Sequence, residues 1–216
     1  LVIDEAMNVV HVDEYYRGEG EKLQVVMTKL NKLIGIEETM AADTYGPIYE
    51  GDEAPVFDFE YVTVSDFTSG GSIHQSGSLS DLIGKKNILL GFYPAPFSMG
   101  CGMELSTFDY MVAGENSDVK MPEEFTKDLE ILMVSNEGLD MLSNWFENMN
   151  FKNVKLISDL NVDISAKYKS FNFYSGYNNR TIFLIDKQGV LRYIDWDYNV
   201  VDKDLKLLQD EIMKLG

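Results

Sequence analysis

The chain has very few of the residues that build disulfides and metal sites. Its 216 residues include one cysteine, Cys101, and two histidines, His11 and His74. One cysteine cannot form an internal disulfide, and a zinc site would need several ligands beyond these three residues. Cys101 is therefore an inert buried thiol, the point of a link between chains, or a reactive nucleophile.

Basic residues are also scarce, at 18 Lys and Arg against 36 Asp and Glu, which gives a net charge of −18. Such a chain is repelled by phosphate backbones, so we expect no nucleic-acid partner. Solubility is enough to explain the acidic surface, and adaptation to high salt is the less favoured alternative.

Long apolar runs are missing as well. No window approaches the roughly 18 consecutive apolar residues that a membrane helix needs. The opening LVIDEAMNVV is too short and too acidic for a signal peptide. We therefore expect a cytoplasmic protein, although a start at Leu1 rather than Met leaves open a signal or anchor that has been removed.

The apolar residues that are present, 45% of the chain, are enough for the core of one domain. Spacing of i, i+3, i+4 and i+7 predicts a helix over residues 13–35, followed by a turn-rich connector with Gly46-Pro47. We expect an N-terminal helical extension and linker over residues 1–49 and a domain over residues 50–216. The apolar face of the helix packs either on its own domain or on a second chain, which leaves a homodimer open.

Strand-like and helix-like segments alternate along the domain, which predicts an α/β fold. A polar loop is predicted over residues 66–78, before a short helical turn. NILLGFY, residues 87–93, is apolar throughout, as in a central strand covered on both faces. A hairpin around Lys187-Gln188-Gly189 makes the predicted sheet mixed. The other predicted strands cover residues 56–64, 129–136 and 154–159, and the predicted helices cover residues 103–112, 139–150, 162–171 and 203–216.

Cys101 follows the apolar strand NILLGFY, and MELSTFDYMV after it predicts a helix, so the thiol is expected at or just inside a helix N-terminus. Unpaired N–H groups at a helix N-terminus carry partial positive charge, which stabilises a thiolate. Gly100 and Gly102 flank the thiol and leave room for a small reagent. The alternative is a small buried core residue, since free cysteine is among the most buried residue types.

The spacing Pro94-x-x-x-Ser98-x-x-Cys101 resembles the motif of the peroxiredoxin family, of the alkyl hydroperoxide reductase and thiol-specific antioxidant type. Further resemblances follow in the family's order: Phe92-Tyr93 before the motif, Glu104-Leu105 after it, GDEAPVF at residues 51–57, LISD at residues 156–159 and RTIFLIDKQGVLRY at residues 180–193. The likeness covers roughly residues 50–213. It implies a thioredoxin-like fold with a central mixed β-sheet flanked by helices, and a peroxidase activity.

The resemblance also implies roles for five residues. Cys101 would attack the O–O bond of a peroxide, and its sulfur would be oxidised to a sulfenic acid. Arg180 would hold the thiolate and donate hydrogen bonds to the peroxide. Ser98 would orient the peroxide or the thiolate, or is a simple helix N-cap. Pro94 would shield the thiol and fix the loop, and it also suits an ordinary strand end. Glu104 would hold an arginine, or is a first-turn carboxylate favoured by the helix dipole.

The chain departs from the family pattern around the thiol. No second cysteine is present, so this is a one-cysteine variant that an external thiol must reduce, either a thioredoxin-like protein or a small thiol. Gly100 and Gly102 stand where the family more often carries Val and Thr. The expected function is a thiol peroxidase acting on hydrogen peroxide or alkyl hydroperoxides without a metal or other cofactor. The alternative is a peroxiredoxin-like redox sensor or interaction domain with little turnover.

Other reaction classes are less well supported by the sequence. A thiol–disulfide oxidoreductase normally needs Cys-x-x-Cys, and Glu104 occupies the second cysteine's place. A Cys–His hydrolase needs a histidine placed beside the thiol, and neither His11 nor His74 has a partner cluster in sequence. Arg192, in the second arm of the predicted hairpin, either supports the site or forms a strand-edge salt bridge.

Overall fold

In the computed structural model, the described residues are 2–3, 9–11, 47–65, 71–113, 118–200 and 202–215. The chain divides into two units, Leu1–Pro47 and Ile48–Gly216. In the first unit, β1 (Val2–Ile3) and β2 (Val9–His11) pair antiparallel. The helix predicted over residues 13–35 lies outside the described residues.

The second unit is built on a seven-stranded sheet in the order β11-β10-β5-β6-β7-β3-β4. Strands β5, β6 and β7 run parallel, and the other pairings are antiparallel, which confirms the predicted mixed sheet. All six residues of β5 are buried, as the apolar run predicted. The strands are β3 (Asp58–Val64), β4 (Ser72–Ser78), β5 (Asn87–Phe92), β6 (Leu129–Ser135), β7 (Val154–Ser158), β10 (Thr181–Ile185) and β11 (Leu191–Asp195).

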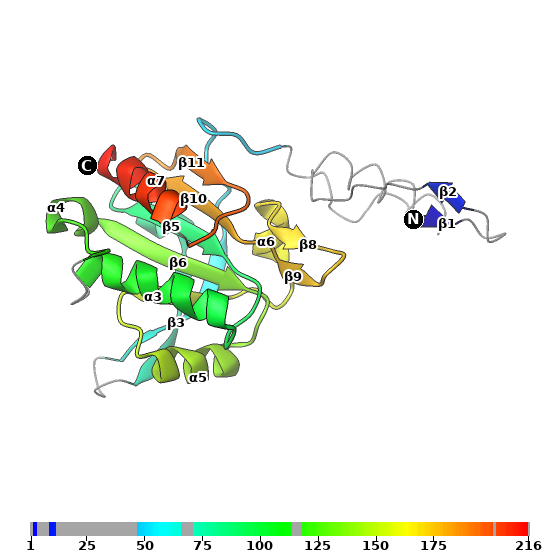
Figure 1. Cartoon of the computed structure of the whole chain (residues 1–216), viewed down its shortest axis with the longest axis horizontal. Helices are drawn as coiled ribbons and strands as arrows, with labels where there is room; N and C mark the ends of the chain where they lie inside the picture. The colour runs from blue at the N-terminus through cyan, green and yellow to red at the C-terminus, as the bar shows by residue number, and fades with distance from the viewer. Residues whose placement is uncertain are drawn as a thin grey trace. The chain divides into compact units, whose positions relative to one another are not determined.

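Helices flank this sheet. Figure 1 shows α3 running alongside β6, with α5 towards β3 and α7 towards β10 and β11. The helices of the unit are α2 (Leu79–Leu82), α3 (Met99–Ala113), α4 (Glu123–Thr126), α5 (Leu139–Met149), α6 (Asp163–Lys167) and α7 (Asp202–Met213).

Side chains alternate along the central strands and divide the core between the two faces of the sheet. Leu89 and Tyr93 belong to one buried cluster, and Ile88, Leu90 and Phe92 belong to the other. Three helices contribute to the cluster on the Cys101 face, through Leu105, Phe108 and Met111 of α3, Leu142, Trp145 and Phe146 of α5, and Leu208 and Ile212 of α7. The predicted amphipathic helix at the C-terminus is confirmed in this way.

Two parts of the predicted secondary structure are wrong. The predicted polar loop over residues 66–78 contains β4, which pairs with β3 along seven residues. This strand lies at the sheet edge and carries polar residues, so it lacks the apolar alternation by which strands are recognised.

The helix predicted through residue 171 ends at Lys167, and Lys169 takes a left-handed backbone conformation with φ 56°. The chain then forms a small hairpin of β8 (Phe171–Asn172) and β9 (Tyr177–Asn178). This hairpin leads directly to Arg180.

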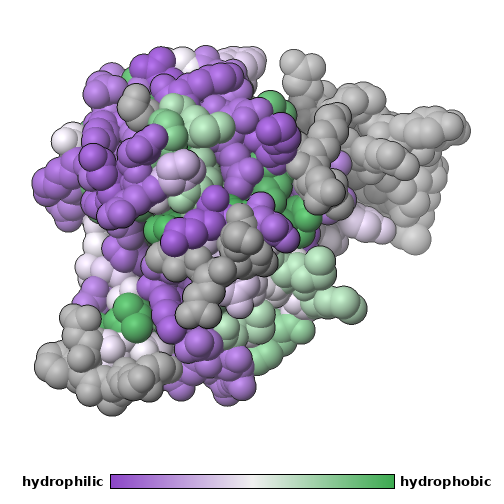
Figure 2. Space-filling model, turned by 60° about the vertical axis from the view of Figure 1, so that its left-hand side comes forward, coloured by the Kyte–Doolittle hydropathy of each residue, from purple (hydrophilic) through white to green (hydrophobic). Residues whose placement is uncertain are grey.

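The surface reflects the charge of the chain. Figure 2 shows that hydrophilic side chains cover most of the face in view. Among the described residues, no helix combines the length and the apolar character needed to cross a bilayer.

Candidate active site

Cys101 is the third residue of α3, and a short loop joins this helix to the end of the central strand β5. Ser98 stands just before the helix, and its Oγ accepts a hydrogen bond of 3.2 Å from the backbone N–H of Cys101. A serine that bonds the N–H three residues ahead is a helix N-cap. Ser98 therefore fixes the helix start, and Cys101 lies in the first turn as expected.

Arg180 reaches the same point from a distant part of the sequence. It directly precedes β10, whose first residue, Thr181, pairs with Phe92 at the end of β5. This antiparallel register brings the guanidinium to the start of α3. Arg180 Nη2 donates a hydrogen bond of 3.2 Å to the Sγ of Cys101, 79 residues away in sequence.

The second nitrogen of the same guanidinium, Nη1, pairs with the carboxylate Oε2 of Glu104. Glu104 lies three residues after Cys101, so both side chains fall on the same side of α3. The side chain of Glu104 is 1% exposed and that of Arg180 is 28% exposed. The arginine is therefore held by two partners from one helix.

Burial raises the pKa of Glu104 to about 7, although the positive charge and hydrogen bond of Arg180 oppose the rise. The carboxylate uses only one of its oxygens in the pair. The other, Oε1, is buried and has no hydrogen-bond partner among the described residues. The neighbouring carboxylate and thiol in turn raise the pKa of Arg180, against the effect of its burial, so this residue stays a cation.

Cys101 itself is completely buried and belongs to the apolar cluster that includes Tyr93 and Trp145. An isolated thiolate would be unstable in such surroundings, because burial disfavours the charged form. Here the sulfur faces a guanidinium and the first turn of a helix, and both favour the thiolate. The arrangement can hold a nucleophilic sulfur anion beside a donor that has N–H groups to spare.

The other candidates from the sequence lie in different places and make different contacts. Pro94 lies half-buried in the loop between β5 and α3, where its fixed φ restricts the chain. Arg192 pairs with Asp186 at 2.5 Å, within its own hairpin, so the salt-bridge alternative holds for it. His74 Nε2 lies 2.7 Å from Ser143 Oγ, in a contact between β4 and α5.

One residue that supports the site has no sequence signal that we recognised. Tyr198 follows β11, is buried, and its backbone N–H donates to the carbonyl oxygen of Arg180 at 3.0 Å. Its ring packs against Phe108 of α3. Tyr198 thus ties the backbone of the arginine to the helix that carries the thiol, and no motif marks it.

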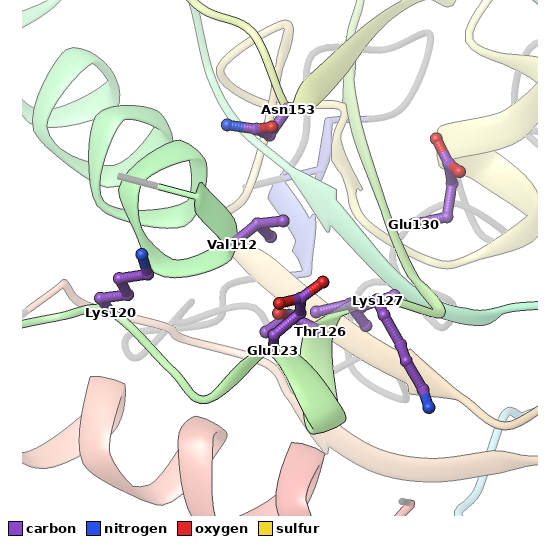
Figure 3. Close-up of a pocket in the computed structure, with 8 residues that line it drawn as sticks. Val112, Lys120, Glu123, Thr126, Lys127, Glu130 and Asn153 are labelled. Carbon is purple, nitrogen blue, oxygen red and sulfur yellow. The ribbon is translucent and has the colours of Figure 1, made fainter. Parts of the chain in front are cut away.

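A pocket lies at the opposite end of α3, where Val112 is part of its wall. Figure 3 shows Lys120 and Lys127 on opposite sides of the Glu123 and Thr126 side chains, so the two ammonium groups do not converge. About 16 Å of helix separates Cys101 from Val112 at 1.5 Å per residue. This pocket is not part of the thiol site.

Comparison with known proteins finds several relatives of this chain. A model of the AhpC/TSA family matches residues 51–194. The chloroplastic 2-Cys peroxiredoxin BAS1 of Spinacia oleracea is 31% identical over 150 residues, which cover 66% of this chain and 50% of that protein. Alkyl hydroperoxide reductase E of Mycobacterium tuberculosis is 28% identical over 156 residues, which cover 71% of this chain and 95% of that protein.

Solved structures show the same fold. Thioredoxin peroxidase I of Plasmodium yoelii matches with a TM-score of 0.60 and 27% identity, over 77% of this chain and 90% of that one. The reduced 2-Cys peroxiredoxin of Plasmodium vivax has a TM-score of 0.62 and 24% identity, over 77% of this chain and 96% of that one. The chain spans about half the length of the chloroplastic relatives from Spinacia oleracea and Arabidopsis thaliana.

Proposed function

The chain belongs to the AhpC/TSA family, the peroxiredoxins, and on that basis we propose that it is a thiol peroxidase that reduces hydrogen peroxide or alkyl hydroperoxides through Cys101. The 3.2 Å contact between Arg180 Nη2 and Cys101 Sγ carries this proposal. It supplies what the reaction needs first, a sulfur held as its anion next to a fixed hydrogen-bond donor.

In the proposed reaction, the Cys101 thiolate attacks one peroxide oxygen. An S–O bond forms, the O–O bond breaks, and the departing oxygen takes a proton to leave as water or an alcohol. The sulfur is oxidised to sulfenic acid and the peroxide is reduced. Arg180 has N–H donors beyond those bound to Sγ and Glu104, and these would bond the peroxide oxygens as negative charge moves onto the leaving oxygen.

Ser98 and Pro94 would act through the shape of the loop. The hydroxyl of Ser98 accepts the backbone N–H of Cys101 and caps α3, which would fix the first turn that carries the sulfur. Pro94 would keep the loop between β5 and α3 in one conformation. Glu104 would hold the guanidinium in place through its pair with Nη1.

Recycling of the sulfenic acid requires thiols from outside these 216 residues, which contain a single cysteine. A first thiol would displace water from the sulfenic acid and form a mixed disulfide. A second would attack that disulfide and release Cys101 as a thiolate. The donor would be a thioredoxin-like protein or a small thiol.

Stopped-flow mixing with hydrogen peroxide tests the proposal, with Cys101→Ser as the matched control. We expect rapid loss of one equivalent of peroxide per chain and trapping of a sulfenic acid at Cys101, both absent in the variant. Continued peroxide consumption is expected once dithiothreitol or thioredoxin with its reductase is added. Oxidation of Cys101 without turnover under either reductant would instead indicate a redox sensor, and no reaction at Cys101 would refute both functions.

A further inference from the structure

Glu104 has a buried carboxylate oxygen that its arginine does not use. Oε2 pairs with Arg180 Nη1, and Oε1 has no hydrogen-bond partner among the described residues. A buried carboxylate oxygen without a donor costs free energy, because it has lost its bonds to water and gained none in return. This oxygen therefore points to a further donor close to the ion pair.

Three buried hydroxyl groups among the described residues also lack a partner, those of Tyr93, Ser135 and Tyr198. Phe92 of β5 pairs with Val134 of β6, so Tyr93 and Ser135, one residue further along each parallel strand, are neighbours. Burial raises the pKa of Tyr93, and the nearby Ser135 hydroxyl opposes this rise. These two hydroxyls can serve each other, which leaves Tyr198 as the donor to be explained.

Tyr198 lies beside the ion pair through two independent contacts. Its ring packs on Phe108 with 5.6 Å between centroids. Phe108 follows Glu104 by four residues, so the two side chains share a face of α3. The backbone N–H of Tyr198 donates to the carbonyl oxygen of Arg180 at 3.0 Å. The tyrosine thus contacts both the helix that carries the carboxylate and the residue that carries the guanidinium.

The charges that act on the Tyr198 hydroxyl agree with this placement. Burial raises the pKa of Tyr198, and the negative charge of Glu104 adds more to the rise than any other charged group does. Smaller contributions come from Asp204, Asp195 and Tyr193. For Tyr93, by contrast, two other groups contribute more than Glu104. Of the two tyrosines, Tyr198 is therefore the better placed to serve this carboxylate.

We propose that the Tyr198 hydroxyl donates a hydrogen bond to Oε1 of Glu104, which makes Tyr198 a positioning residue for the thiol site. Neither atom has a partner among the described residues, so the bond forms by a small rotation of the side chains or through one bridging water. Hydrogen bonds then run from Tyr198 through Glu104 and Arg180 to the sulfur of Cys101. The hydroxyl holds the carboxylate as an anion, and the anion holds the guanidinium beside the sulfur. This inference deepens the proposed function and rests on it for the kinetic readout alone.

The test removes the hydroxyl alone, in Tyr198→Phe, and measures urea unfolding of the full chain at pH 5 and at pH 9. Loss of a hydrogen bond to the carboxylate raises the pKa of Glu104 in the folded state further above its value in the unfolded chain. A rise in pH then destabilises the variant more than it destabilises the wild type. We expect the unfolding equilibrium constant of the variant, relative to wild type, to be about tenfold larger at pH 9 than at pH 5.

Two further comparisons separate this effect from the loss of any buried hydroxyl. Tyr168 donates to the carbonyl oxygen of Pro55 at 2.8 Å and belongs to the buried cluster on the other face of the sheet. Tyr168→Phe should therefore destabilise the protein equally at the two pH values. In a Glu104→Gln background, Tyr198→Phe should also lose stability equally at both, because no carboxylate remains to titrate.

Three results would overturn the proposal. One is a loss of stability in Tyr198→Phe that is the same at pH 5 and pH 9. Another is a pH-dependent loss that persists in the Glu104→Gln background. The third is a pH-dependent loss in Tyr93→Phe that Glu104→Gln abolishes, with none in Tyr198→Phe, which would assign the role to Tyr93.

The rate of reaction with hydrogen peroxide is the second readout. At neutral pH it should fall about threefold in Tyr198→Phe, less than in Glu104→Gln, because the tyrosine acts through the carboxylate. An unchanged rate in Tyr198→Phe would refute its role in positioning the site. If stability depends on pH as expected while the wild type consumes no peroxide, the proposed function fails and the bond to Glu104 stands. If the wild type consumes peroxide rapidly and Tyr198→Phe loses the same stability at both pH values, the proposed function stands and the role of Tyr198 fails.

Discussion

An ion pair between an arginine and a buried carboxylate lies at each end of strand β10. Arg180 precedes the strand and pairs with Glu104, which is 76 residues away in sequence and 1% exposed. Asp186 follows the strand and pairs with Arg192, six residues away, at 2.5 Å. The Asp186 side chain is 7% exposed, and that of Arg192 is 49% exposed. By residue type and burial of the acid the two pairs look alike.

They differ in what else the partners contact. Asp186 Oδ1 accepts backbone N–H groups from Gln188 and Val190 at 2.9 Å, and Oδ2 accepts from Arg192, so both oxygens of this carboxylate are bonded. Glu104 has a buried oxygen with no hydrogen-bond partner among the described residues. Its arginine also bonds the sulfur of Cys101. One pair therefore reinforces a local turn, and the other holds a cation over a nucleophile.

Removal of Arg180 should have the largest effect on the peroxide rate of any change to either ion pair. In Arg180→Ala, we expect the second-order rate with hydrogen peroxide to fall about 100-fold, as for loss of one hydrogen-bond donor to a developing anion. Stopped-flow kinetics at neutral pH would measure this.

Arg180→Lys is the matched control for Arg180→Ala. Lysine keeps the positive charge but cannot reach the sulfur and Glu104 with two nitrogens of one rigid plane. We expect its rate to lie between those of wild type and Arg180→Ala. A wild-type rate in Arg180→Ala would show that the guanidinium has no part in the reaction.

The next largest effect is expected from the carboxylate of the same pair. In Glu104→Gln, the amide oxygen can still accept from Arg180 Nη1, but the charge attraction is lost. We expect the peroxide rate to fall about fivefold, equivalent to about 1 kcal/mol of transition-state stabilisation. A rate below that of Arg180→Ala would mean that Glu104 has a role beyond holding the arginine.

The Glu104→Gln variant should also differ from wild type in how stability depends on pH. Burial raises the pKa of Glu104 in the folded state from its ordinary 4.5 to about 7. At a pH between these values the folded state holds this proton and the unfolded state does not, so a rise in pH through this range destabilises the fold.

Urea unfolding of both proteins at pH 5 and at pH 7.5 would measure the pH effect. Relative to Glu104→Gln, the wild type should lose between about 1 and 3 kcal/mol of unfolding free energy over that interval. Parallel pH profiles of the two proteins would contradict the raised pKa.

The sequence could predict the elements whose signal is local. The apolar run of β5 marked a central strand, and the hairpin of β10 and β11 was marked by its turn at Gly189 and the apolar strands beside it. Cys101 was expected at or just inside a helix N-terminus because a strand precedes it and the helix-like residues 103–112 follow it. Each of these features depends on neighbours in sequence, so pattern and composition suffice to find it.

Tertiary relations could not be predicted in the same way. Edge strand β4 carries polar residues and gains its strand character only from pairing with β3. Sequence alone also left Arg192 open as a second site residue, because its role depends on which carboxylate the fold brings near it. The approach of Arg180 to Cys101 depends on an antiparallel register set some 80 residues further along the chain, and only the resemblance to a family brought that arginine to the thiol.

The smallest effect should come from the structural end of β10, and it sharpens the contrast with Arg180. In Arg192→Ala, the backbone N–H groups of Gln188 and Val190 still bond Oδ1 of Asp186, and the lost arginine is half-exposed. We expect a stability loss of at most about 1 kcal/mol in urea unfolding. The peroxide rate should stay within about twofold of wild type, as for other surface substitutions. Arg180→Ala and Arg192→Ala remove the same kind of side chain near the same strand. A comparable loss of the peroxide rate in both variants would mean that activity responds to general damage of the sheet. It would then not depend on the cation that faces the sulfur.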